Sequence, residues 1–201
     1  MPENPLGHPS KLCHDTPTAV FRSLVQAALN RQGVTATELG EFYLVTLLES
    51  LLRPAEPFMT RPLGVRYLEA LQAPAPVRER TLRHVGDTAL ALCGLFPESL
   101  ERSLVGPEYY EGIGRHAYHA LAALSFRSRH DRALAEVFGD LAQRFPVFSA
   151  VLAEVAYAAI FPQDCDVVGL YRRWRYARSP GHAARLLAAG LIPAPPSDTQ
   201  H

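Results

Sequence analysis

Apolar residues recur at intervals of three and four through most of the chain, which is the spacing of an amphipathic α-helix. Prolines and glycines divide this pattern into separate segments. Alternating runs of β-branched residues, which indicate strands, are missing from the sequence. The pattern predicts an all-α fold, a single globular bundle of about eight to ten helices. The predicted helices cover residues 17–30, 35–52, 63–72, 77–95, 97–104, 107–124, 131–145, 146–161 and 166–177, and a last short helix ends at Gly190.

Residues 146–161 are apolar nearly all round, so this segment is expected to be the central helix of the bundle. The helix over 35–52 is expected to begin with a capping box, because Thr35 and Glu38 have the spacing in which hydroxyl and carboxylate each accept from a free backbone N–H. The domain is expected over residues 16–192. A flexible arm (1–15) and a flexible tail (193–201) are expected to flank it, because both are rich in proline.

The composition of the chain excludes several classes of protein. The chain has 201 residues, of which 48% are hydrophobic, and its 20 basic and 20 acidic residues balance. This excludes a disordered protein and a globally basic nucleic-acid binder. Three widely separated cysteines suggest free thiols, and the first residues lack the pattern of a signal peptide. Because the longest apolar run is also shorter than the roughly 20 residues of a membrane span, a cytoplasmic protein without a spanning helix is expected.

The sequence contains few catalytic motifs. Gly112 to Ala117 fits G-x-G-x-x-A, but it lies within a helical pattern, so these glycines are interpreted as sites of close helix packing and not as a dinucleotide loop. Walker, G-x-S-x-G, H-E-x-x-H and Glu-x-x-His motifs do not occur. The sequence therefore specifies no metal site, leaves any cofactor undetermined, and weighs against an enzyme.

One looser group of titratable residues has helical spacings. His116 and His119 are three residues apart, and Glu111 is on the stripe of His119. A site where these helices meet could bind a metal or perform acid/base chemistry, because buried carboxylates must be paired or neutralised. The favoured alternative is that each residue is satisfied separately, Glu154 by one arginine. The candidate polar cluster comprises Glu49, His84, Asp87, Glu111, His116, His119 and Glu154.

A second candidate is a basic and aromatic segment near the C-terminus. Guanidinium groups bind phosphates and carboxylates, and an indole can stack on a base, so an anion or nucleic-acid site is one interpretation. The favoured interpretation is that Trp174 anchors its helix to the core while the arginines are solvated, and the zero net charge argues against nucleic acid. The candidate residues are Arg172, Arg173, Trp174, Arg175 and Arg178.

Two stretches carry a resemblance to a known family. The first contains Gly86-Asp87, Phe96-Pro97-Glu98 and Tyr109-Tyr110, and the second contains Trp174 and ends at Pro193. Together they resemble an uncharacterised bacterial family of small all-helical proteins. The resemblance implies the fold and no activity. The leading functional hypothesis is thus a non-enzymatic cytoplasmic protein that acts through protein contacts, as a homo-oligomer or a regulatory adaptor.

Overall fold

The computed structural model describes residues 16–52, 61–101, 105–124 and 129–160, together with residues 171, 174, 183, 186–187 and 190–191. Within these residues the regular elements are all helices, which confirms the all-α class. Seven of them have ten residues or more, fewer than the eight to ten expected, and the eighth has five. They are α1 (Pro17–Gln32), α2 (Glu38–Leu51), α3 (Leu63–Gln72), α4 (Ala75–Leu95), α5 (Pro97–Glu101), α6 (Pro107–Ala122), α7 (Arg129–Gln143) and α8 (Phe145–Ile160).

Several expected segments lie outside the described residues. These are the arm (1–15), the tail (193–201) and most of the helices expected over 166–177 and up to Gly190. The extent of the domain therefore stays a prediction.

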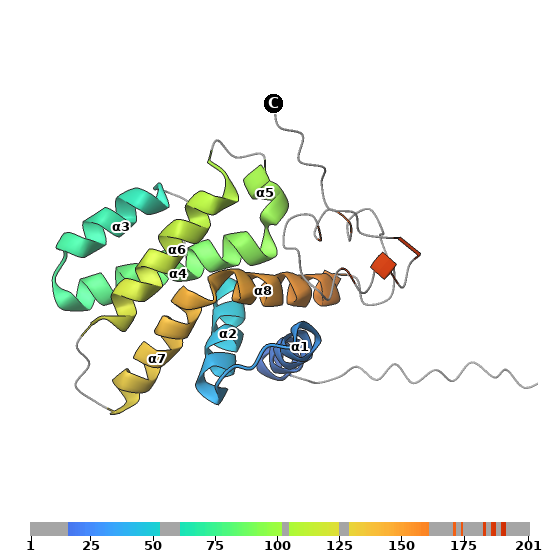
Figure 1. The fold of residues 1–201 in the computed structure, drawn as a ribbon. Coiled ribbons are helices and arrows are strands. Elements are labelled where there is room, and N and C mark those ends of the chain that lie inside the picture. The colour runs from blue at the N-terminus through green and yellow to red at the C-terminus, as the bar shows by residue number, and fades with distance from the viewer. Residues whose placement is uncertain are drawn as a thin grey trace, which may run out of the picture.

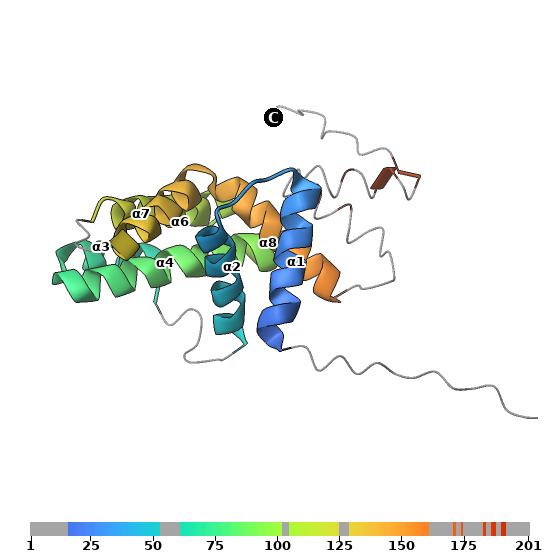
Figure 2. The same cartoon turned by 90° about the horizontal axis from the view of Figure 1, so that it is seen from below.

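The longest helix, α4, lies at the centre of the arrangement and packs against α3, α5, α6 and α8 (Figure 1). Helix α8 continues the core away from α4 and also packs against α1, α6 and α7. Seen from below, α1 and α2 lie side by side and run across the direction of α4 (Figure 2). Helix α3 is at the edge of the molecule, where it packs on α4 and α6.

Capping residues and a glycine mark the ends of the first two helices, and one predicted N-terminus is wrong. Thr16 caps α1, and Gly33 ends it at a φ of 64°, a conformation that glycine adopts without strain. The prediction of a capping box at Thr35 is wrong. Thr37 is the N-cap of α2, and its hydroxyl accepts from the backbone N–H of Gly40 at 3.1 Å. Thr35 lies outside the helix, and its carbonyl accepts a hydrogen bond from Arg144 at 3.0 Å.

One continuous core draws residues from all eight helices. The prediction for residues 146–161 is confirmed, since every residue from Phe148 to Val155 is buried in α8. Helix α4 shares this central place, with a buried run from Thr88 to Gly94. The hydrophobic effect acting on these two helices is the main driving force for the fold.

Glycines let the central helices approach closely. A Cβ on Gly114 of α6 would lie 2.5 Å from the ring of Phe145 and 2.9 Å from Cβ of Ala89. A Cβ on Gly86 of α4 would likewise lie 2.8 Å from the ring of Tyr118. The packing role predicted for the glycines of the G-x-G-x-x-A stretch is therefore confirmed for Gly114. It is wrong for Gly112, beside which a Cβ would meet nothing within 4 Å.

Candidate functional site

A partly buried hydrogen-bond network joins three helices around Asp87 of α4. Oδ1 of Asp87 accepts from the hydroxyl of Tyr43 of α2 at 2.5 Å and from that of Tyr118 of α6 at 2.8 Å. Both tyrosine rings contact Phe138 of α7. The ring of Tyr43 lies edge-on to it, with 5.5 Å between the ring centroids, and the ring of Tyr118 is stacked on it, with 6.0 Å between the centroids. We call Asp87, Tyr43 and Tyr118 the Asp87 network. It ties α2, α4 and α6 together beside α7.

The network has unusual protonation behaviour. Burial raises the pKa of Asp87 from 3.8 to about 6, while the two hydroxyl donors and the charge of Arg83 act in the opposite direction. Burial, followed by the charge of Asp87, also raises the pKa values of Tyr43 and Tyr118 above their ordinary 10. A carboxyl group that titrates near pH 6 can exchange a proton close to neutrality. Its oxygen is, however, engaged by two tyrosines of the chain itself.

Two other acids of the candidate polar cluster have partners elsewhere. Glu154 of α8 is fully buried, and its Oε1 lies 2.7 Å from the guanidinium of Arg31 of α1. This confirms the alternative in which one arginine pairs with Glu154. Glu49 of α2 accepts a hydrogen bond from the hydroxyl of Thr18 of α1. Both interactions join the first two helices to their neighbours, and neither involves a histidine.

The remaining members lie on α4 and α6. His84 is exposed on α4, and Glu111 is 3.5 Å from the guanidinium of Arg115, one turn further along α6. His116 and His119 lie together in the lining of a pocket. The structure thus brings the two histidines together and gives Glu49, Asp87 and Glu154 separate partners.

The cluster does not form a metal centre in the described part of the chain. Among those residues, no group of three or more His, Cys, Asp or Glu side chains could hold a metal ion. The physical reason is that Asp87 and Glu154 each accept from donors of the chain itself, tyrosine hydroxyls in one case and a guanidinium in the other.

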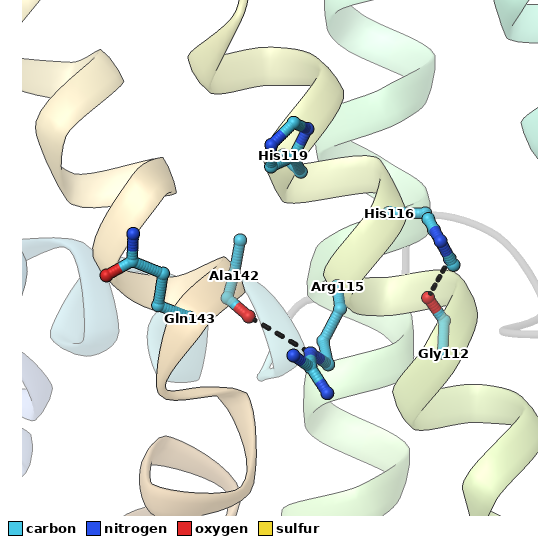
Figure 3. Close-up of a pocket in the computed structure, with 6 residues that line it drawn as sticks. All are labelled: Gly112, Arg115, His116, His119, Ala142 and Gln143. Atoms are coloured by element: carbon cyan, nitrogen blue, oxygen red, sulfur yellow. Dashed lines mark hydrogen bonds between the residues drawn. The ribbon is translucent and has the colours of Figure 1, made fainter.

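The pocket has a volume of about 360 Å³ and opens between α6 and α7 (Figure 3). Its lining comprises Gly112, Arg115, His116, His119, Ala142 and Gln143. The spacing of the α6 members puts them on one face of that helix. No acidic side chain belongs to this lining.

Local contacts orient the pocket's side chains. Nε of Arg115 donates to the carbonyl oxygen of Ala142 at 3.2 Å, which holds the guanidinium across the gap between the helices. Nδ1 of His116 is 2.7 Å from the carbonyl oxygen of Gly112, so that ring turns back along its own helix (Figure 3). His119 and Gln143 are exposed, on opposite sides of the pocket.

The basic segment is described at two positions. Trp174 is 7% exposed and packs with Tyr157 of α8 and Leu186, beside Tyr171. Its indole is therefore a core group, as the favoured interpretation predicted, and is not open for stacking. The four arginines of this candidate, Arg172, Arg173, Arg175 and Arg178, lie outside the described residues, so their anion-binding role stays a prediction.

An exposed apolar face on α3 is a further candidate. Val65, Leu68 and Leu71 are 45%, 60% and 42% exposed, whereas Leu63 and Ala70 on the opposite side of the helix are buried. We call the three exposed residues the α3 face. Sequence reasoning placed the helix correctly and missed this face, because a ten-residue helix with apolar residues on both sides does not show which side packs inward.

The described helices include none that is long and apolar enough to cross a membrane. No protein-family model, no curated protein and no solved structure matches the chain. These results agree with the resemblance to an uncharacterised family. The bacterial origin implied by that resemblance stays a prediction.

Proposed function

We propose that this protein is a non-enzymatic interaction protein that associates with a second copy of itself through the α3 face. The observation that carries the proposal is the exposure of three large apolar side chains on one short helix, Leu68 at 60% most of all. Single exposed apolar residues are ordinary on protein surfaces, but a contiguous group is typical of an interaction site.

The position of α3 suits this role. It is at the edge of the molecule, packed on α4 and α6 through its buried side, so its outer side is accessible to another chain (Figure 1). Association would remove Val65, Leu68 and Leu71 from water, and the gain in free energy scales with the apolar area that is buried.

The proposed occupant of the face is a second copy of the chain. When two copies of α3 cross antiparallel at Leu68, Leu68 of each copy meets Leu68 of the other, and Val65 of each copy comes level with Leu71 of the other. The same three apolar residues therefore cover one another, which is the self-complementarity that a two-fold interface requires.

Sedimentation velocity over a range of protein concentrations tests the proposal. The wild-type chain is expected to shift from monomer to dimer as concentration rises, and Leu68→Glu is expected to remain monomeric because two carboxylates would face each other at the crossing point. The matched control is Phe42→Glu, at a residue on α2 that is 52% exposed. A wild-type chain that is monomeric throughout, or an equal loss in both variants, would contradict it.

A mixture of two charged variants identifies the occupant. Leu68→Glu and Leu68→Lys are each expected to stay monomeric, because each places like charges together at the crossing point. An equimolar mixture of the two is expected to dimerise, since opposite charges then face each other in the symmetric pair. A mixture that stays monomeric would rule out the symmetric antiparallel arrangement.

The remaining parts of the functional hypothesis are consistent with this proposal. The cytoplasm is the proposed compartment, because an odd number of widely spaced cysteines suits a reducing environment. The acid/base alternative is less well supported, since the carboxyl with the raised pKa, Asp87, does not line the pocket between α6 and α7.

A further inference from the structure

We infer that the pocket between α6 and α7 binds the oxyanion group of a small organic molecule, a carboxylate or a phosphate ester, through Arg115, His119 and Gln143. This site is separate from the α3 face, and it does not depend on self-association. A small-molecule binding site is therefore assigned to a protein whose proposed function is self-association.

The chemistry of the lining points to an anion. Arg115 contributes a guanidinium, whose planar array of N–H groups matches a carboxylate or a phosphate, and Gln143 contributes an amide donor from the opposite helix. His119 adds a ring nitrogen that can donate. The six lining residues include three basic side chains and no acid, so a negative group entering the pocket meets donors from both helices.

The guanidinium is already held in place before any ligand arrives. Its Nε is bound to the carbonyl oxygen of Ala142, which leaves the terminal nitrogens of Arg115 as the donors that can reach a ligand. A donor fixed in this way loses less conformational entropy on binding than a freely rotating one.

One acid competes with the ligand. Oε1 of Glu111 is 3.5 Å from a terminal nitrogen of Arg115, and this pair is partly exposed. Such a surface ion pair is weak, so an incoming oxyanion can displace it. Removal of the Glu111 charge should therefore strengthen ligand binding, whereas removal of Arg115 should weaken it.

The test is an NMR titration of the full chain with sodium phosphate and, separately, with sodium acetate, at constant ionic strength. Saturable shifts are expected at the side-chain amide of Gln143 and the backbone amide of Gly112. A preference for phosphate would identify a phosphate ester as the ligand class, and a preference for acetate a carboxylate. Absence of saturable shifts with either salt would overturn the inference.

Variants separate binding from folding. Arg115→Ala is expected to weaken binding by about tenfold, the effect of losing a hydrogen bond to a charged group, and His119→Ala by a smaller factor. Glu111→Gln is expected to tighten binding, a gain that unfolding cannot produce. The control is Arg22→Ala, at an exposed arginine of α1 outside the pocket. Equal weakening in Arg115→Ala and Arg22→Ala, or weaker binding by Glu111→Gln, would contradict the site.

Discussion

Tyr118 and His119 are consecutive residues of α6, yet they belong to opposite kinds of environment. Tyr118 is fully buried and donates to Asp87 in the centre of the molecule, whereas His119 is exposed in the pocket beside α7. In the Asp87 network, both tyrosine hydroxyls donate to a carboxylate oxygen of the chain itself. The pocket instead presents donors to solvent. The comparison indicates that one face of α6 holds the fold together while the adjacent face is available for a ligand.

The largest expected difference between the two faces concerns glycines. Gly114→Ala should destabilise the protein by about 3 kcal/mol, the upper range for overpacking a core, because the new methyl group would collide with Phe145 and Ala89. Gly112→Ala, two residues earlier in the pocket lining, should stabilise it by about 0.5 kcal/mol, since alanine is the better helix former and a Cβ meets nothing there. Urea unfolding of both variants measures the difference. Similar free energies of unfolding would contradict the assignment of the two faces.

The next effect is the pH dependence of stability. The pKa of Asp87 is about 6 in the folded chain, above the ordinary 3.8 that it has in the unfolded chain, so the folded state binds its proton more tightly. The contribution of Asp87 to stability is fully present below pH 3.8 and is lost as the pH rises through 6. With allowance for its partial exposure, the loss is about 2 kcal/mol.

Asp87→Asn isolates this contribution. The amide keeps an oxygen that accepts from both tyrosines but carries no charge at any pH. Relative to the wild type, the variant should gain stability progressively between pH 4 and pH 8, as measured by urea unfolding at each pH. Parallel pH profiles for the two proteins would show that the pKa of Asp87 is not raised in the folded state, and would contradict the account of the network.

A smaller effect is expected from removing one donor. Tyr118→Phe should cost about 1 kcal/mol, the usual value of one buried hydrogen bond, and should move the pKa of Asp87 further upward because one of the interactions that lowers it is lost. Tyr109→Phe, at a tyrosine that is 38% exposed on the same helix, is the control and should change stability little. Equal effects in thermal unfolding would mean that the hydroxyl of Tyr118 is not engaged.

The smallest effect is expected in the pocket. His119→Ala should change the free energy of unfolding by less than about 0.5 kcal/mol, as is usual for an exposed side chain. If this variant proved as destabilising as Tyr118→Phe, His119 would be part of the structural framework, and the comparison between the two faces of α6 would fail. Differential scanning calorimetry of both variants gives the answer.

The helices were readable from the sequence because prolines and glycines mark their ends. Helix α6 begins at Pro107, as predicted, and α3 spans the predicted residues 63–72. The start of α2 was misplaced at Thr35, because Thr37 offers the same hydroxyl two residues later and the local pattern does not distinguish them. Contacts between residues far apart in sequence are not visible in a local pattern.

The candidate site could be predicted only in part. Sequence spacing correctly put His116 and His119 on one face of one helix, since that relation is local. The partners of Asp87 were missed, because Tyr43 is 44 residues away in the chain and nothing in its own segment identifies it as a donor. Helical spacing predicts which residues share a face, and it does not predict which helix that face meets.

The central functional claim is that α3 pairs with α3 of a second copy, and disulfide cross-linking at Leu68 tests it most directly. Cysteines introduced as Leu68→Cys would meet at the crossing point of a symmetric antiparallel pair, within the roughly 7 Å between Cα atoms that a disulfide allows. Mild oxidation should then give a covalent dimer on a non-reducing gel, while Phe42→Cys should give no more than the wild type. A Leu68→Cys protein that stays monomeric under conditions in which its thiol is oxidisable would contradict the claim.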